Sequence, residues 1–238
     1  SRGLGDVYKR QIPTNGGAFD AYLARPEQAG PAPGVVVIQE IFGVNPNIKG
    51  VADWLAGEGY CALALDLFWR LERNVSITDP DDAELEKAFG LMTAFDQEAG
   101  VGDIQTAIDF LRADKDLCTG KVGTLGFCLG GKMAYLSATG TDADANIGYY
   151  GVGIQDMLDE AKKISAPLVL HMAGQDEFVP PEAQAAVHAG LDTHAQVSIF
   201  DYPEQDHGFT REGGMHFDAA ATASAHARSL ETLAGALR

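Results

Sequence analysis

The sequence predicts an α/β fold, with a mostly parallel central sheet and helices on both faces. From residue 12 onward, short apolar runs alternate with longer segments in which apolar residues recur at helical spacing. This order is typical of parallel strands joined by helices. Most of the short runs are almost purely apolar, as strands buried on both faces are. No repeat or linker interrupts the pattern, so we expect a single domain over residues 12–238.

Each element is assigned from its own pattern. Helical spacing of apolar residues predicts helices at 48–58, 102–113 and 217–237, and one more that begins near Lys132. The polar segment 69–80 is expected to be a long loop. The first residues, SRGLGDVYKRQ, lack an initiator Met and a secretory apolar core, so we expect 1–11 to be a non-native or disordered segment. The expected strands are 21–23, 34–38, 61–65, 121–126, 145–150, 167–172 and 196–202.

Charge and composition exclude several classes of partner. With 17 Lys and Arg against 34 Asp and Glu, the formal net charge is −17, which would repel nucleic acid or an anionic bilayer. No apolar run approaches the roughly 20 residues of a membrane span. The cysteines Cys61, Cys118 and Cys128 are odd in number and lack CxxC spacing, which argues against disulfides or a zinc cluster. We expect a cytoplasmic protein, a monomer or weak oligomer, without metal or cofactor.

A candidate nucleophile, Cys128, lies where a predicted strand turns into a helix. The segment GFCLG at 126–130 places small residues on both sides of it, and this is the pattern of a nucleophile elbow. The helix N-terminus favours a thiolate there and offers the Leu129 N–H to an oxyanion. The alternative is one more buried cysteine. A GxxxxGK pattern also occurs here, but methionine follows it where a phosphate-binding loop needs a hydroxyl.

An acid and a base follow the candidate nucleophile in the order that this elbow predicts. Asp176 comes directly after the strand at 167–172, and His207 comes after the strand at 196–202. Both positions are at carboxyl ends of strands, where open α/β sheets bind ligands. Asp206 is a rival acid, but a sequence neighbour seldom points at the imidazole, so we favour Asp176. The other histidines are expected to be surface or core residues: His171, His188, His194, His216 and His226.

On these motifs the sequence resembles the dienelactone hydrolase family of α/β-hydrolases, from about Gly16 to near the C-terminus. The resemblance implies the α/β-hydrolase fold and an ester- or lactone-opening activity. Its most specific parts are QEIFGVN at 39–45, DLFWR at 66–70, the elbow at 126–131, GYYG at 148–151, GQD at 174–176 followed by VP at 179–180, and HGF at 207–209 followed by Arg211.

The resemblance also implies roles for individual residues. The family's triad falls on Cys128, Asp176 and His207. Glu40 would contact the resting thiol until a substrate carboxylate displaces it, and a nearby carboxylate does disfavour a thiolate by like-charge repulsion. The alternative for Glu40 is an N-cap or a solvated loop acid. The expected oxyanion donors are the backbone N–H groups of Ile41 and Leu129.

Substrate binding is expected to depend on a local positive charge that the acidic chain otherwise lacks. Arg70 and Arg211 would clamp a substrate carboxylate, and Phe42 and Tyr150 are expected to line the substrate site. The chain departs from the family after Arg70, where LERN replaces a Pro-Gly turn. Arg73 could therefore take part of the clamp's role.

The expected function is a cysteine hydrolase that opens a small unsaturated lactone carrying a carboxylate, with dienelactone to maleylacetate as the specific reaction. The triad determines the type of reaction, acyl transfer, whereas the pocket determines which acyl group is accepted. A carboxylesterase of broader specificity is therefore the alternative within the same class. A non-catalytic binding or redox-sensing module that uses Cys128 as an oxidisable thiol is the alternative from another class.

Overall fold

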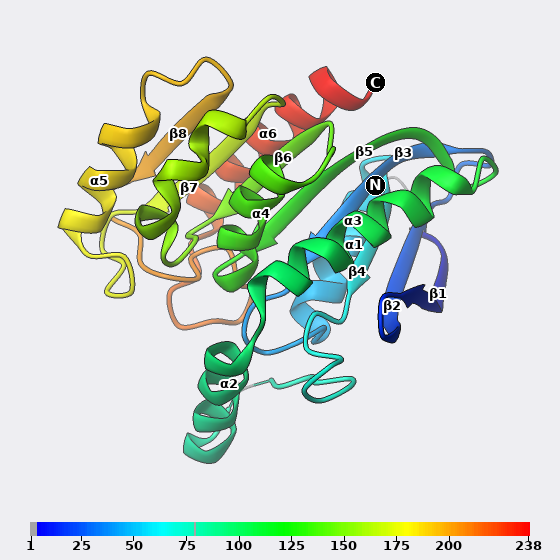
Figure 1. Ribbon diagram of the computed structural model, residues 1–238, viewed down its shortest axis with the longest axis horizontal. Coiled ribbons are helices and arrows are strands. Elements are labelled where there is room, and N and C mark those ends of the chain that lie inside the picture. Colours follow the sequence, from blue (N-terminus) through cyan, green and yellow to red (C-terminus); the bar gives the residue numbers. More distant parts are fainter. Residues whose placement is uncertain (1–3, 79) are drawn as a thin grey trace.

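The computed structural model describes residues 4–78 and 80–238, which build one mixed sheet with helices on both faces (Figure 1). The sheet has eight strands in the order β1-β2-β4-β3-β5-β6-β7-β8. From β4 to β8 all neighbours are parallel, whereas β1 and β2 pair antiparallel at one edge. The strands are β1 Leu4–Thr14, β2 Gly17–Pro26, β3 Ala32–Ile38, β4 Cys61–Leu65, β5 Cys118–Phe127, β6 Ala145–Tyr149, β7 Leu168–Ala173 and β8 Val197–Tyr202.

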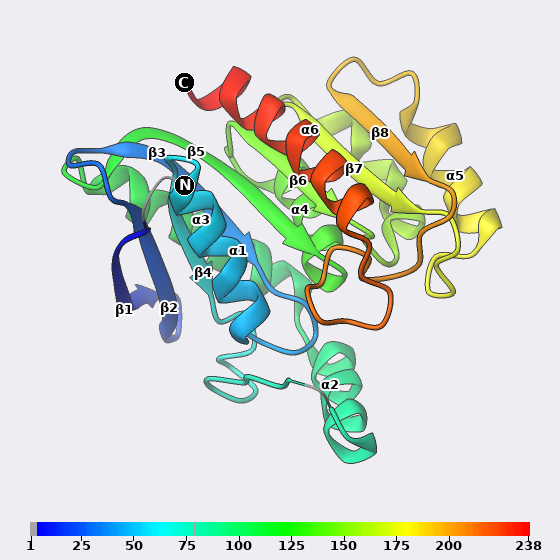
Figure 2. The same cartoon turned by 180° about the vertical axis from the view of Figure 1, so that it is seen from behind.

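Helices cover both faces of the sheet. The α-helices α3 and α4 pack on one face, over β3, β5 and β6, while α1 and α6 pack on the other, as Figure 2 shows from behind. Every residue of β4 and β6 is buried, which explains why their sequences are nearly purely apolar. The helices are α1 Pro46–Gly57, α2 Asp82–Ala94, α3 Gln97–Ala113, α4 Leu129–Gly140, the 3₁₀ segment η1 Ile154–Lys163, α5 Pro181–Leu191 and α6 Ala219–Leu237.

The predicted fold class is confirmed, and each expected strand overlaps an observed one. The structure adds α2 and α5, whose apolar spacing is weak, and the 3₁₀ segment η1. In α2 only Ala88 is buried, because this helix projects from the body of the molecule (Figures 1 and 2). Its start is nevertheless well defined, since Asp81 and Glu84 form a reciprocal capping box.

The N-terminal segment departs from expectation. Residues 4–11 belong to β1, which pairs with β2 over most of its length, so they form a strand where the sequence predicted a non-native or disordered segment, and a non-native origin stays a prediction. Tyr8, Lys9, Arg10 and Gln11 of this strand are all exposed, so this edge strand lacks the apolar run by which buried strands are recognised. Ile12 of this strand is 1% exposed and joins the core. Residues 1–3 lie outside the described residues.

Two of the three cysteines serve the core. Cys61 and Cys118 are buried free thiols, as the sequence analysis expected. Burial raises the pKa of Cys61 to about 12, so this thiol is protonated at neutral pH. In the described part of the chain, no helix is long and apolar enough to cross a membrane.

Candidate active site

The turn between β5 and α4 presents Cys128 in a strained conformation. Its backbone lies at φ 55° and ψ −114°, a region that non-glycine residues rarely adopt. A Cβ on Gly126 would lie 2.1 Å from the Gly130 carbonyl oxygen, and a Cβ on Gly130 would lie 2.3 Å from the oxygen of Ile38. Both positions therefore require glycine. The backbone of α4 can approach β3 and β5 this closely only because both positions are glycine, as the predicted elbow requires.

The loops after β7 and β8 bring Asp176 and His207 together. His207 Nδ1 lies 2.7 Å from Asp176 Oδ2. The other oxygen, Oδ1, accepts the Phe178 N–H at 2.9 Å, so the carboxylate is held from two sides. Asp176 is 3% exposed, which keeps water from competing for the imidazole.

The rival acid, Asp206, is engaged elsewhere. Its Oδ1 accepts the backbone N–H of His207 at 2.6 Å, and its Oδ2 pairs with His216 Nδ1 at 3.0 Å. Neither contact orients the His207 ring. The choice of Asp176 over its rival agrees with the geometry.

The second side of the His207 ring faces Cys128. Burial opposes protonation of the imidazole, but hydrogen bonds to Asp176 and to the Cys128 sulfur outweigh it and raise the pKa of His207 to about 10. An imidazolium at neutral pH is the partner that a thiolate needs. Cys128, His207 and Asp176 thus form one connected line of side chains.

Near Cys128, no hydrogen bond to a described residue is seen from the backbone N–H groups of Ile41 and Leu129. Leu129 is the first residue of α4, and Ile41 follows β3, which runs parallel to β5 with Ile38 beside Gly126. Both residues are at least 95% buried. Free N–H groups on buried residues are uncommon, so the prediction that this pair donates to an oxyanion is kept for the proposed function.

Glu40 and Arg211 form a buried pair beside Cys128. Arg211 donates from Nε to one carboxylate oxygen at 3.0 Å and from a terminal nitrogen to the other at 2.7 Å. Glu40 is fully buried, and its charge outweighs the burial of Arg211 and raises the pKa of that guanidinium. The resemblance implies a contact between Glu40 and the resting thiol. In the structure the Glu40 carboxylate accepts hydrogen bonds from Arg211 instead. Among the described residues, no hydrogen bond joins Glu40 and Cys128.

Phe42 lies against Arg211, and Tyr150 lies against His207. The Arg211 guanidinium stands 5.2 Å from the centre of the Phe42 ring. Tyr150 packs its edge against His207 at 5.0 Å, and its hydroxyl is 2.8 Å from Thr210 Oγ1. Burial and then the charge of Glu40 raise the pKa of Tyr150, so its phenol remains protonated. Tyr150 is a positive-φ residue, with φ 37°.

Arg70, in contrast, is turned away from this cluster. Both of its terminal nitrogens bind the Asp103 carboxylate, and one also donates to the Asn15 carbonyl at 3.1 Å. The expected partnership of Arg70 with Arg211 therefore has no support in the contacts. Arg73 stacks over Trp69, 5.3 Å from the ring centre, and is likewise not placed with Arg211.

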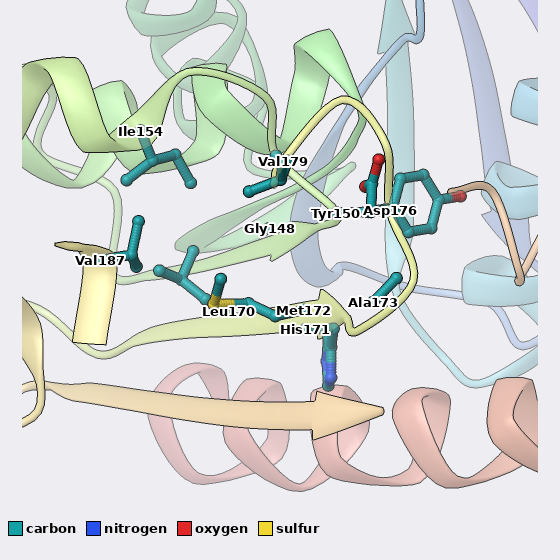
Figure 3. A pocket seen from close by; sticks show the side chains of 11 residues that line it. Gly148, Tyr150, Ile154, Leu170, His171, Met172, Ala173, Asp176, Val179 and Val187 are labelled. Carbon is teal, nitrogen blue, oxygen red and sulfur yellow. The ribbon is translucent and has the colours of Figure 1, made fainter. Parts of the chain in front are cut away.

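Figure 3 shows a small cavity behind the acid, with Asp176 and Tyr150 at one end and Ile154 and Val187 at the other. Its volume of about 10 Å³ has space for about one water molecule. It is a packing gap beneath the loop that carries Asp176 rather than a substrate site. In the described part of the chain, no three His, Cys, Asp or Glu side chains gather so as to hold a metal ion.

Sequence reasoning missed several residues of this region. Thr210 holds the Tyr150 hydroxyl, and Phe178 packs its edge on the His207 ring at 4.9 Å. Both adjoin motifs that the sequence did single out, so their position in the chain was the available signal. Gln39 is part of the segment QEIFGVN at 39–45, and its signal was weaker because nothing set it apart from the rest of that segment.

An eight-stranded, mostly parallel sheet with a nucleophile elbow and an acid and base on later loops defines an α/β-hydrolase. The model of the dienelactone hydrolase family matches residues 19–237, and the chain belongs to this family. It is therefore an enzyme, a carboxymethylenebutenolidase-like carboxylic ester hydrolase, which removes the non-catalytic thiol module as an alternative.

Individual relatives and structures agree with this assignment. The chain is 41% identical over 213 residues to a putative carboxymethylenebutenolidase of Azospirillum brasilense, covering 90% of this chain and 91% of that protein. It is 38% identical over 220 residues to the carboxymethylenebutenolidase of Pseudomonas putida, covering 92% of each. A crystal structure of a putative dienelactone hydrolase from Klebsiella pneumoniae superposes with a TM-score of 0.85 at 27% identity, covering 97% of this chain and 98% of the other.

Proposed function

We propose that this hydrolase opens small unsaturated lactones that carry a carboxylate, such as dienelactone, through a Cys128–His207–Asp176 triad. The observation that carries the proposal is the Glu40–Arg211 pair next to Cys128, because it places a guanidinium where a substrate carboxylate can reach it. Relatives named carboxymethylenebutenolidase support the same substrate class.

The chemistry follows from the protonation states. The Cys128 thiolate attacks the lactone carbonyl, and the N–H groups of Ile41 and Leu129 stabilise the oxyanion. When the tetrahedral intermediate collapses, the ring C–O bond breaks and an acyl-thioester remains on Cys128. The leaving oxygen departs as an enolate, which needs no strong acid. The enolate takes the proton of the His207 imidazolium, and the neutral ring then takes a proton from water, whose oxygen attacks the thioester and releases the product acid and the thiolate.

Arg211 and Glu40 connect substrate charge to the nucleophile. A substrate carboxylate offers Arg211 the same bidentate contacts that Glu40 makes, so the two anions compete for one guanidinium. We propose that a Glu40 released in this way can accept the thiol proton, which leaves the thiolate paired with His207. An anionic substrate then promotes formation of its own nucleophile, whereas a neutral ester cannot displace Glu40 and is turned over more slowly.

A carboxylesterase of broader specificity is the second candidate, and one observation favours it. Because Arg70 is neutralised by Asp103, Arg211 is left as the one arginine in contact with the described cluster. A single guanidinium binds a carboxylate less selectively than a two-arginine clamp.

The test is steady-state turnover of dienelactone and of p-nitrophenyl acetate by the wild type and by Cys128→Ala. We expect Cys128→Ala to abolish turnover of both, because both depend on one thiolate, and the wild type to prefer the lactone in kcat/KM. Full activity in Cys128→Ala would refute the nucleophile. Equal kcat/KM values for the two substrates in the wild type would establish the broader esterase.

A further inference from the structure

From its contacts we infer that Gln39 is a positioning residue: its side-chain amide fixes the peptide unit that carries the Ile41 N–H. The inference rests on the proposed function, in which that N–H holds the oxyanion. It goes beyond that function because it assigns a task to a residue that touches neither substrate nor the triad.

Gln39 uses both ends of its amide. The side chain is fully buried, its Oε1 accepts the Leu67 N–H at 3.0 Å, and its Nε2 donates to the Glu40 carbonyl at 3.2 Å. Leu67 follows β4 and Glu40 follows β3, which are neighbouring parallel strands. The amide therefore joins two loops across the carboxyl edge of the sheet, and its own position is set by the Leu67 N–H.

The Glu40 carbonyl is the right group to hold. It belongs to the same peptide unit as the Ile41 N–H, and a trans peptide is planar with its C=O and N–H pointing in opposite directions. A donor on the carbonyl side therefore fixes the direction of the N–H on the other side. The same hydrogen bond polarises the peptide and makes its N–H a stronger donor.

Neighbouring contacts do not supply this restraint. The Phe42 carbonyl accepts the Ile77 N–H at 3.0 Å, and Asn45 donates to the Ile77 carbonyl at 3.0 Å, so the loop is anchored just beyond Ile41. Neither of these hydrogen bonds restrains the peptide unit that joins Glu40 to Ile41. In the described chain, the Gln39 amide is the one hydrogen bond that this peptide makes.

Removing the amide separates oxyanion stabilisation from thiol reactivity. Hydrolysis passes through an oxyanion, whereas alkylation of Cys128 by iodoacetamide is a direct displacement that forms none. In Gln39→Met, which keeps the length and burial of the side chain, we expect kcat for p-nitrophenyl acetate to fall about 10- to 100-fold. Complete loss of an oxyanion donor costs about 10²–10³-fold, and a misdirected one costs less. KM and the alkylation rate should stay within about twofold of wild type.

Two further variants complete the design. Gln39→Asn keeps an amide that is too short to span Leu67 and Glu40, so we expect a kcat between those of wild type and Gln39→Met. Gln105→Met makes the same change on α3, where the amide binds Asp109 and Asp142, and should leave kcat unchanged. Thermal unfolding of each variant measures stability.

Either of two results would overturn the inference: wild-type kcat in folded Gln39→Met, or a parallel loss of hydrolysis and alkylation in both Gln39 variants, which would indicate general damage to the site. Failure of the proposed function looks different, because it appears as missing turnover in the wild type or as activity that survives in Cys128→Ala.

Discussion

The molecule contains two arginine–carboxylate pairs that look alike and differ in what else holds the acid. Glu40 with Arg211 and Asp103 with Arg70 both combine a carboxylate at most 1% exposed with an arginine about one-third exposed. Asp103 also accepts the Trp69 indole N–H at 2.8 Å and the Thr14 hydroxyl at 3.0 Å, whereas Glu40 has Arg211 alone among the described residues.

The difference teaches how to tell a structural pair from a functional one. Asp103 ties α3 to the loop after β4 and to the end of β1, so losing Arg70 breaks a network. Glu40 has a single side-chain partner among the described residues and lies beside Cys128, as the proposed competition with a substrate carboxylate requires. Residue type, the burial of the acid and the exposure of the arginine are similar in the two pairs, and the number of additional partners separates them.

The largest expected effect is on substrate selectivity in Arg211→Met. We expect the ratio of kcat/KM for dienelactone to that for p-nitrophenyl acetate to fall about 10- to 100-fold, since a hydrogen bond to a charged group contributes about 1.5–3 kcal/mol. Most of the change should appear in KM for the lactone. A loss of activity that affects both substrates equally cancels in this ratio. An unchanged ratio would show that Arg211 does not bind the substrate.

The matched change, Arg70→Met, should affect stability without affecting selectivity. Removing one partner of a buried pair leaves an uncompensated charge, so we expect the free energy of unfolding to fall by about 2–3 kcal/mol, discounted for the partial exposure of Arg70. Urea unfolding measures this, and the selectivity ratio should stay within twofold of wild type. A selectivity loss equal to that of Arg211→Met would restore Arg70 to the substrate clamp.

Neutralising each acid tests whether Glu40 acts on the thiol. In Glu40→Gln we expect alkylation of Cys128 by iodoacetamide at pH 7 to become about three- to tenfold faster, because a like charge that opposes the thiolate is gone while Arg211 remains. Asp103→Asn is the control and should alkylate at the wild-type rate. Equal rates in the wild type and Glu40→Gln would contradict a gating role.

The smallest expected effect concerns pH. Because the pKa of His207 is raised to about 10 in the fold, against about 6.5 in the unfolded chain, its stabilisation is complete below about pH 6.5 and is lost as pH rises through about 10. The difference in unfolding free energy between the wild type and His207→Gln should therefore shrink by more than about 1 kcal/mol between pH 7 and pH 10.5. A difference independent of pH would mean that His207 is neutral in the folded protein.

Much of the site could be predicted because its parts are local. The glycines around Cys128, and the positions of Asp176 and His207 directly after strands, follow from what a tight turn and a parallel sheet require. The strand β1 and the helix α2 were harder, since one is a half-exposed edge and the other buries little of its surface. The partner of Arg70 is 33 residues away in sequence, and no local pattern reports such a pairing.

The most direct test of the account is the wild-type kcat/KM for dienelactone compared with that for its neutral methyl ester. The two substrates share the ring that Cys128 would attack and differ in the carboxylate, which in the ester carries a methyl group and lacks the charge that Arg211 would bind. We expect the acid to be preferred by at least about tenfold, the value of one charge-assisted contact. Equal values, or a preference for the ester, would contradict the claim that the Glu40–Arg211 pair recognises an anionic substrate.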